Sequence, residues 1–385
     1  MKKLFVLVSL LVLATLILSA CGTPATPAPT EPPVVATEPP VPTEPPMPAW
    51  EAPAGAFVAF PVDAAPTLDG VGDEAFWADA EETVVDVDGG FGDFATQVHL
   101  KAVYTADSVY FLVTYEDPTE SWFRSPWQKQ EDGTWAKVKD PNDKGGDNNT
   151  VYEDKMAFIW PINNSIPKFE TKGCYTACHA GENSDVKPYG NKYTANEGEI
   201  GDIWHWKTIR NLGQLDDQYV DATRYSADTP EAGRKGDAKE SGGYKDNYAS
   251  MPDPADATKT VADKTKPGFT SPAVDMTTAF PGFILDSEKV ALDQAALDAM
   301  PVGSYLPGII KSAFVGDRGD LSAGWTYADG KWTLEFGRKL DTGSATDVQF
   351  TDLTAMYYFG VAVFENAQVR HATQTAPSFM VFKPR

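Results

Sequence analysis

The chain has 385 residues, a formal net charge of −23 and only three cysteines. An acidic chain of this kind lacks the clustered lysine and arginine that bind phosphate backbones, which argues against nucleic acid as a partner. The charge favours solubility, and it could also steer encounters with the basic face of a redox partner.

The N-terminus has the order of an export signal. Lys2 and Lys3 precede an apolar run over residues 4–18, and small residues then lead to Cys21. This order predicts a signal peptide over residues 1–20 and resembles the lipobox of bacterial lipoproteins, in which Cys21 becomes the lipidated first residue. The apolar run is short for a transmembrane helix of about 20 residues. We therefore expect a lipid anchor in the cell membrane, with the polypeptide on its extracytoplasmic side, in the periplasm or at the cell surface.

Residues 22–50 are dominated by proline and threonine. Proline at this density favours extended polyproline II segments and cannot form a packed core. Cys21 and this linker, residues 21–50, are therefore expected to tether a single globular body over residues 51–385.

The first and last parts of the body have the pattern of β-strands. Alternating apolar residues with β-branched and aromatic side chains are separated by short polar turns, and the Asp329-Gly330 pair is a strong hairpin signal. The strands expected from this pattern cover residues 97–104, 109–115, 155–160, 324–327, 332–336, 356–364 and 378–382.

The middle of the body, residues 162–300, is rich in glycine, proline and charge. We expect long loops there with few regular elements, one of them a short helix around residues 287–300. Strands on both sides of such insertions predict a mainly β fold, an immunoglobulin-like β-sandwich whose long loop insertions carry the functional site. Acidic loops such as residues 140–154 could hold Ca²⁺ through oxygen ligands, although no EF-hand spacing is present.

The stretch from Cys174 to His179 reads Cys-Tyr-Thr-Ala-Cys-His. Covalent attachment of a c-type haem needs two thiols and an adjacent imidazole, usually spaced Cys-x-x-Cys-His, so this motif has one extra residue. On this interpretation Cys174 and Cys178 form thioethers with one haem, and His179 is the proximal ligand of its iron. Two alternatives remain open: a Cys174–Cys178 disulfide and a metal site such as zinc.

The second iron ligand must come from elsewhere in the chain. His205 is the leading candidate, because it lies in the sequence Trp-His-Trp-Lys, whose two indoles would exclude water from a haem edge. In an extended segment His205 and Lys207 share one face. Met156 and Lys207 are the alternative distal ligands. His99 and His371 fall in or beside expected strands and are interpreted as structural.

Several short stretches carry a family resemblance that covers the body from about residue 60 to residue 385. In their order along the chain they resemble the haem-binding domain shared by cytochrome c-552-like proteins and the gamma subunits of ethylbenzene dehydrogenase and related molybdenum enzymes. These stretches are residues 69–70, 73–77, 109–113, 116–119, 152–155, 160–161, 173–179, 202–207, 316–320, 330–333 and 369–371.

The resemblance implies a β-sandwich similar to certain carbohydrate-binding modules and electron transfer through one haem. The gamma subunits hold a non-covalent b haem by a methionine and a lysine, the ligand types of Met156 and Lys207. This chain departs from them, because Cys174, Cys178 and His179 imply covalent attachment with a histidine ligand.

These features together predict an extracytoplasmic monohaem cytochrome c that transfers electrons and has no catalysis of its own. Its expected partners are redox proteins, including, from the resemblance alone, a molybdenum oxidoreductase. The alternative from another class is a carbohydrate- or solute-binding lipoprotein without haem, because the ten tryptophans could stack on sugars.

Overall fold

The structure of the protein is a computed structural model that describes residues 50–385, except 144–145, 179–191, 230–231, 239–240 and 280. The predicted signal peptide, the predicted lipidated Cys21 and the linker up to residue 49 lie outside the described residues, as does His179. Among the described residues, no helix has the length and apolar character needed to cross a bilayer.

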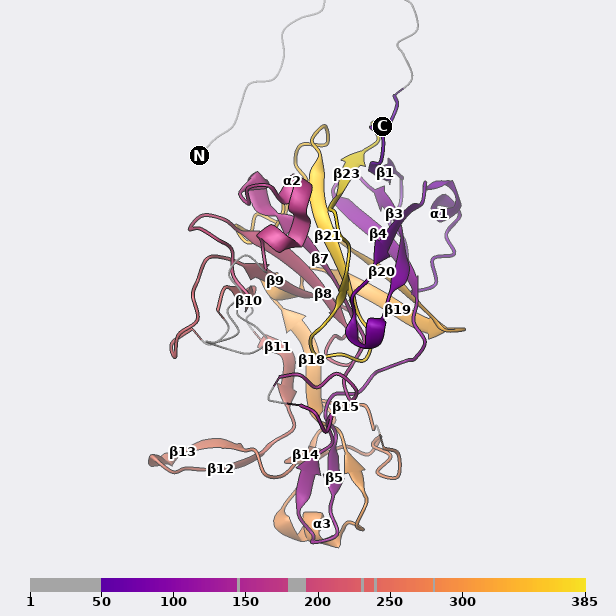
Figure 1. Ribbon diagram of the computed structural model, residues 1–385. Helices are drawn as coiled ribbons and strands as arrows, with labels where there is room; N and C mark the ends of the chain where they lie inside the picture. The colour runs from indigo at the N-terminus through magenta and orange to yellow at the C-terminus, as the bar shows by residue number, and fades with distance from the viewer. Residues whose placement is uncertain (1–49, 144–145, 179–191, 230–231, 239–240, 280) are drawn as a thin grey trace, which may run out of the picture. The chain divides into compact units, whose positions relative to one another are not determined.

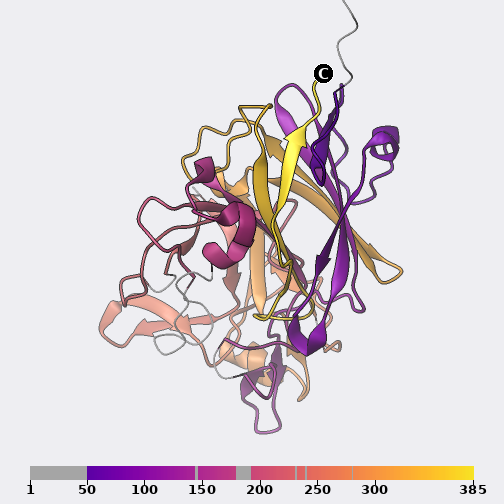
Figure 2. The ribbon, with the colours of Figure 1, turned by 45° about the horizontal axis from the view of Figure 1, so that its top comes forward.

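The main body is a β-sandwich of two layers (Figures 1 and 2). The first layer contains β1 (Phe57–Pro61), β2 (Thr83–Val87), β3 (Thr96–Tyr104), β4 (Ser108–Glu116), β19 (Ser322–Ala328), β20 (Lys331–Lys339) and β23 (Ser378–Phe382). The second layer contains β7 (Lys155–Pro161), β8 (Gly201–Lys207), β9 (Asp216–Val220), β10 (Arg234–Gly236), β21 (Tyr357–Phe364) and β22 (Ala372–Thr373).

Strand β21 joins the two layers. Its first residues, 357–359, pair with β23, and its remaining residues, 360–364, pair with β7. The hydrogen-bonded order is therefore continuous from β10 through β9, β8, β7, β21, β23, β1, β3, β4 and β20 to β19.

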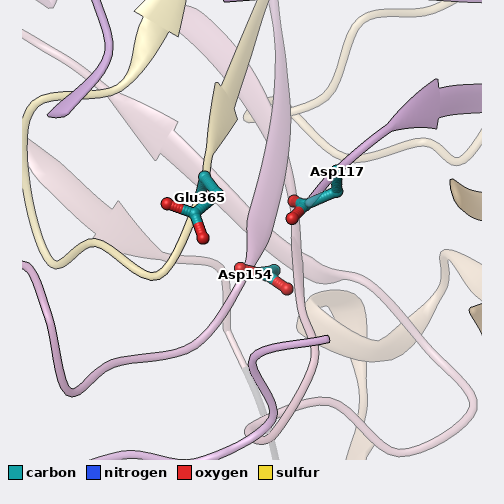
Figure 3. A group of neighbouring side chains, drawn as sticks. All are labelled: Asp117, Asp154 and Glu365. Atoms are coloured by element: carbon teal, nitrogen blue, oxygen red, sulfur yellow. The ribbon is translucent and has the colours of Figure 1, made fainter. Parts of the chain in front are cut away.

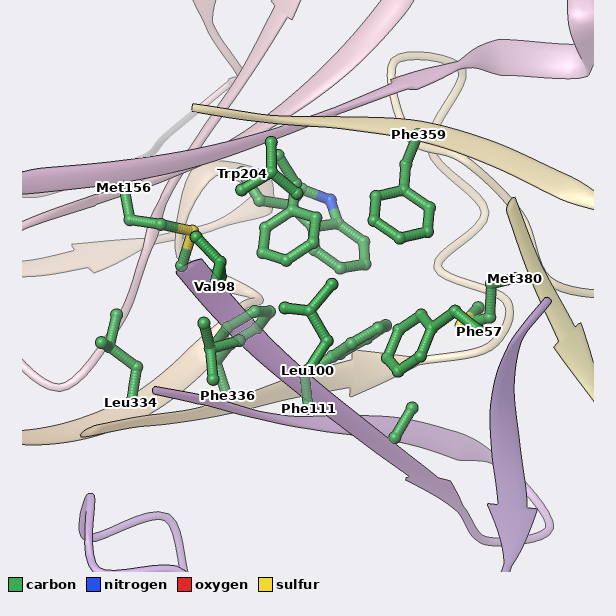
Figure 4. Packing of buried hydrophobic residues seen from close by; sticks show 14 of the residues in the cluster. Phe57, Val98, Leu100, Phe111, Met156, Trp204, Leu334, Phe336, Phe359 and Met380 are labelled. Atoms are coloured by element: carbon green, nitrogen blue, oxygen red, sulfur yellow. The ribbon is translucent and has the colours of Figure 1, made fainter. Parts of the chain in front are cut away.

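An aromatic core fills the space between the layers (Figure 4). Phe111 of β4 stacks on Phe336 of β20 with ring centroids 5.3 Å apart, and the edge of Trp204 of β8 meets Phe111 at 5.4 Å. The long strands, such as β3, β4, β8 and β20, contribute every second residue to this core, as the period of two of a β-strand requires. Burial of such large side chains is the main stabilising contribution of the sandwich.

Outside the sandwich, β5 (Trp127–Lys129), β6 (Trp135–Lys137) and β17 (Tyr305–Leu306) form a small sheet that contributes to an apolar cluster with Trp127, Leu297 and Leu306. Three further small sheets are formed by β11 (Ser241–Asp246), β18 (Ile309–Val315) and β15 (Phe283–Leu285), by β12 (Ala249–Asp253) and β13 (Asp256–Asp263), and by β14 (Phe269–Thr270) and β16 (Val290–Ala291). In the described part of the whole chain, the α-helices are α1 (Ala75–Asp79), α2 (Phe169–Lys172) and α3 (Gln294–Ala299). The 3-10 turns are η1 (Phe91–Asp93), η2 (Ile162–Asn164), η3 (Gly173–Thr176) and η4 (Asp317–Gly319).

The mainly β fold and the expected sandwich are confirmed. The predicted hairpin over residues 97–115 is β3 and β4, and the predicted strands over residues 155–160, 356–364 and 378–382 are β7, β21 and β23. The Asp329-Gly330 turn joins β19 to β20, and both of its residues have positive φ, 53° and 75°. That conformation matches the right-handed twist of a two-residue hairpin.

The expectation of few regular elements in residues 162–300 is wrong. This stretch contains β8 to β16, and β8, β9 and β10 belong to the main sandwich. Strand β8 is hard to recognise in the sequence because its charged residues, such as Asp202 and Lys207, are buried. A polar, charged run does not show the apolar alternation by which a half-buried strand is recognised. The predicted helix is present but short, as α3.

Candidate functional site

The two cysteines of the motif lie against the outer face of the second layer, opposite the aromatic core. Cys174 belongs to η3, directly after α2, and Cys178 follows shortly after; the two thiols are not bonded to each other. Cys174 is 9% exposed, and its Sγ lies 3.5 Å from Oγ1 of Thr373 in β22. Both cysteines pack with outward side chains of the layer, including Ile159 and Ile203.

Small residues let the cysteine segment approach this face closely. Gly360 of β21 pairs with Ile159, and Ala362 pairs with Ala157 of β7. A Cβ atom on Gly360 would stand 3.2 Å from Cγ2 of Ile159 and 3.8 Å from Cβ of Cys174. Cys174 therefore lies directly over the backbone of β21, where a larger side chain at position 360 would crowd Ile159.

His205 of β8 lies on the same outer face, in register with Ala157. Its Nδ1 is 3.1 Å from Oε1 of Gln218, and the amide of Gln218 is oriented by a donation from its Nε2 to Asp216. Nδ1 therefore carries the proton and donates to Gln218. The other ring nitrogen, Nε2, is buried and has no hydrogen-bond partner among the described residues.

Several positive charges surround His205. Burial lowers the pKa of the imidazole well below its usual value, and the charges of Lys207, Lys155 and Arg234 lower it further. The ring is thus neutral at physiological pH, with its Nε2 lone pair available, which is the form that binds a metal. Burial raises the pKa of the Cys178 thiol, and the charge of Arg234 opposes that increase. Arg234 thus acts on both groups.

The prediction that His205 and Lys207 share one face is confirmed, because Trp204 and Trp206 point into the sandwich core. The same finding shows that the indoles do not shield the outer face, contrary to expectation. Their place beside His205 is taken by Phe364 of β21, whose ring stacks at 5.9 Å between centroids.

The two alternative distal ligands are less well placed than His205. Met156 is fully buried in the sandwich core and pairs with Trp206, so the structure does not bring it to the cysteines. Lys207 is on the outer face, but its Nζ donates to Asp216, which Arg318 also contacts. Burial lowers the pKa of Lys207, and Asp216 opposes this effect.

The other histidines separate into two cases. His99 of β3 lies near the surface, with Nδ1 2.9 Å from Oε1 of Glu82, as a structural residue would. His371 stands directly before β22, and its ring lies 4.8 Å from that of Phe364. Phe364 therefore contacts both His205 and His371. His371 reaches this face through the pairing of β21 with β22, which no local sequence pattern indicates.

Lys155 is a further residue of this face that the sequence did not single out. It is 2% exposed, and its Nζ donates to the carbonyl of Gln368 and lies 3.9 Å from the centroid of the Phe364 ring. No carboxylate among the described residues forms an ion pair with Lys155. Burial lowers its pKa well below the usual value, and the charge of Arg210 adds to this effect. A buried ammonium of this kind favours an anionic neighbour.

The outer face thus combines features that fit a haem: two thiols that are not bonded to each other, a neutral imidazole whose Nε2 has no hydrogen-bond partner among the described residues, and a buried lysine without a carboxylate partner among them. The fold and these groups define a β-sandwich that gathers thiols, an imidazole and a buried lysine on the outer face of one layer.

The family model described as ethylbenzene dehydrogenase matches residues 75–376, so the chain belongs to that family. No curated protein matches the chain. Among solved structures, a family 9 carbohydrate-binding module from Caldicellulosiruptor kristjanssonii with cellotriose is similar at 9% identity and a TM-score of 0.29, over 85% of this chain and 94% of that one. The same module with glucose is similar at 8% identity and a TM-score of 0.30, over 85% of this chain and 96% of that one.

A protein of Bacteroides uniformis that is described as carbohydrate-binding is similar at 6% identity and a TM-score of 0.29, over 85% of this chain and 99% of that one. Scores this low support no argument about function.

Proposed function

We propose that this chain is a haem-binding member of its family, of the gamma-subunit and cytochrome c-552 type, carried as a bacterial lipoprotein. On this proposal it is an electron-transfer protein on the extracytoplasmic face of the membrane, without catalysis of its own. Its partner would be a respiratory oxidoreductase, of the molybdenum class that the family resemblance implies. The observation that carries the proposal is the shared outer face of Cys174, Cys178 and His205.

Each residue of this face has a definite part in the proposal. Cys174 and Cys178 would hold the haem through thioethers, and His179, which lies outside the described residues, would be the proximal ligand. His205 would supply the second nitrogen through Nε2, with its ring fixed by Gln218. The haem would supply one-electron chemistry, whose potential depends on ligands, burial and nearby charge.

Lys155 would balance negative charge at this face. A haem carries two carboxylates, and a buried ammonium beside Phe364 offers a partner for one of them. The same charge would disfavour the oxidised form of the iron, because that form carries one more positive charge.

The carbohydrate-binding alternative has less support. Seven of the ten tryptophans are buried, and only Trp50 and Trp122 are among the exposed large apolar residues. Sugar stacking needs an accessible ring face. The tryptophans are therefore explained by the packing of the cores rather than by a sugar site.

The proposal is tested with the full chain, produced in a host with a haem-attachment system. We expect reduced-minus-oxidised haem bands and an intact mass that includes one haem. The double variant C174A/C178A should lose the covalent haem, whereas H99A, a matched histidine change outside the site, should keep it. A native chain with a Cys174–Cys178 disulfide and no haem would falsify the proposal.

A further inference from the structure

Three carboxylates meet beside the ends of three strands (Figure 3). Asp117 follows β4, Asp154 precedes β7 and Glu365 follows β21. One oxygen of each lies within 4.8 Å of one oxygen of the other two. Asp154 is the last residue of the acidic loop for which the sequence suggested Ca²⁺, but Asp117 and Glu365 come from strands far away in the sequence.

This acidic trio, Asp117, Asp154 and Glu365, is mostly buried. Asp117 is 1% exposed and Asp154 is fully buried, whereas Glu365 is partly exposed. Asp154 accepts hydrogen bonds from the backbone of Ser121 and Asn366 and from the indole of Trp332, at 2.7, 2.8 and 3.2 Å. Its position is thus fixed by donors that do not belong to the trio.

One oxygen of the trio is left without a partner. Oδ1 of Asp117 accepts from the backbone of Thr119 at 3.1 Å, but its Oδ2 is buried and makes no hydrogen bond with any described residue. In Figure 3 the Asp117 carboxylate points toward Asp154 and Glu365. The hydroxyl of Tyr115, a fully buried neighbour on β4, also has no partner. A buried carboxylate oxygen without a hydrogen bond requires an explanation, for which an ion or a water is a physical candidate.

A second acidic cluster shows how the protein neutralises such groups elsewhere. Asp202, Asp217 and Asp347 also bring their oxygens within 4.8 Å of one another, and Arg338 lies among them at 2.9, 3.2 and 3.3 Å. The acidic trio has no equivalent of Arg338, since no lysine or arginine in the described part of the chain forms an ion pair with it.

The pKa values of the trio also reflect the lack of a cationic side chain beside it among the described residues. Burial raises the pKa of Asp117 to about 7, and Glu365 adds to the increase. Burial also raises the pKa of Asp154 well above its usual value, and the charge of Asp117 raises it further. Either protons or a cation must therefore balance the negative charge at neutral pH.

We propose that the acidic trio binds one Ca²⁺ ion. Ca²⁺ takes hard oxygen ligands in flexible geometry, and carboxylates from three separate elements suit it. The partly exposed Glu365, whose Oε1 accepts from the hydroxyl of Thr119 at 2.7 Å, provides access from solvent. The ion would join β4 of the first layer to β7 and β21 of the second. The acidic trio shares no residue with the proposed haem site.

The first experiment compares thermal unfolding of the full chain in EDTA and in excess CaCl₂. Ca²⁺ that binds only the folded state should raise Tm, and D117N should remove most of that increase. In EDTA, D117N should be at least as stable as the native chain, because it removes a buried charge. E116Q is the matched control, because Glu116 is the exposed neighbour of Asp117 and the substitution removes the same charge. The Ca²⁺-dependent increase in Tm should be retained in this variant.

Two results would overturn the proposal. One is an equal Tm of the native chain in EDTA and in CaCl₂. The other is the same Ca²⁺-dependent increase in D117N as in the native chain. If D117N fails to fold, E365Q replaces it, and equilibrium dialysis with radioactive Ca²⁺ should show one site whose affinity falls by about tenfold or more. Unchanged affinity in E365Q would also contradict the site.

Discussion

The two faces of strand β8 contrast sharply, although they alternate residue by residue. Trp204 and Trp206 point inward, where they are fully buried among other aromatic rings. His205 and Lys207 point outward and are also buried, yet they lie among positive charges and one ring nitrogen has no partner. The inner face is aromatic and apolar except for its indole N–H groups, of which that of Trp206 has no hydrogen-bond partner among the described residues, whereas the outer face gathers several cations around an imidazole. Burial alone therefore does not distinguish a core from a site; the chemical kind of the buried groups does.

The largest expected effect breaks the inner face. W204A should lower the free energy of unfolding by about 3–5 kcal/mol, because it leaves a cavity among Phe111, Phe336 and their neighbours. H205A should cost only about 1 kcal/mol in the haem-free chain, as it loses one hydrogen bond. Urea unfolding measures both. Equal losses for the two variants would remove the contrast between the faces.

The next variant separates the structural part of the outer face from the site. D216N leaves Lys207 buried without its carboxylate and should cost about 3 kcal/mol. D221N, whose partner Lys235 is partly exposed, is the control and should cost less than about 1 kcal/mol. A loss below 1 kcal/mol in D216N, from the same urea titration, would show that the Lys207 ion pair does not stabilise this face.

A smaller effect is expected from Lys155. K155M should stabilise the haem-free chain by about 1 kcal/mol, since the buried ammonium without a carboxylate is removed. In the haem-loaded chain it should lower the reduction potential, because the oxidised iron loses a repelling charge. K331M, at an exposed position of β20, should change neither quantity. A potential that is unchanged in K155M, measured by spectroelectrochemistry, would place Lys155 away from the redox centre.

The smallest effect is a pH dependence from His205. Its folded pKa lies well below 6.5, so below pH 6.5 the unfolded chain binds a proton that the folded chain does not. Stability from this residue is therefore present above pH 6.5 and is lost as the pH falls, by at most about 1.4 kcal/mol per unit. The difference between the native chain and H205Q isolates this contribution. If the free energy of unfolding of the haem-free chain changes with pH at the same slope in the native chain and in H205Q between pH 7.5 and 5, the buried imidazole is not neutral.

The sequence was sufficient where local signals agree with the fold. Strand β4 alternates apolar and polar residues, and Asp329-Gly330 adopts the positive φ angles of a hairpin turn. The Trp-His-Trp-Lys stretch divides between two faces as its period of two requires. In each case the deciding interaction lies within a few residues along the chain.

The sequence was insufficient where distant pairing decides. Met156 has the ligand chemistry expected of an alternative distal ligand, but β7 turns that thioether into the core. His371 and Lys155 reach the site face through β22 and β7, next to Phe364. The acidic trio likewise combines the ends of three strands. No local pattern reports which strand ends or strand faces will meet.

Strand β21 gives the two proposed sites a common backbone. Phe364 stacks against His205, and the next residue, Glu365, belongs to the acidic trio. A ligand that fixes one of these residues restricts its neighbour, so Ca²⁺ and haem would share a coupling free energy. Thermodynamic linkage makes such coupling reciprocal: any factor by which Ca²⁺ changes haem affinity is the factor by which haem changes Ca²⁺ affinity. A change in the calcium concentration outside the cell would then change the affinity for haem, through the peptide unit that joins Phe364 to Glu365.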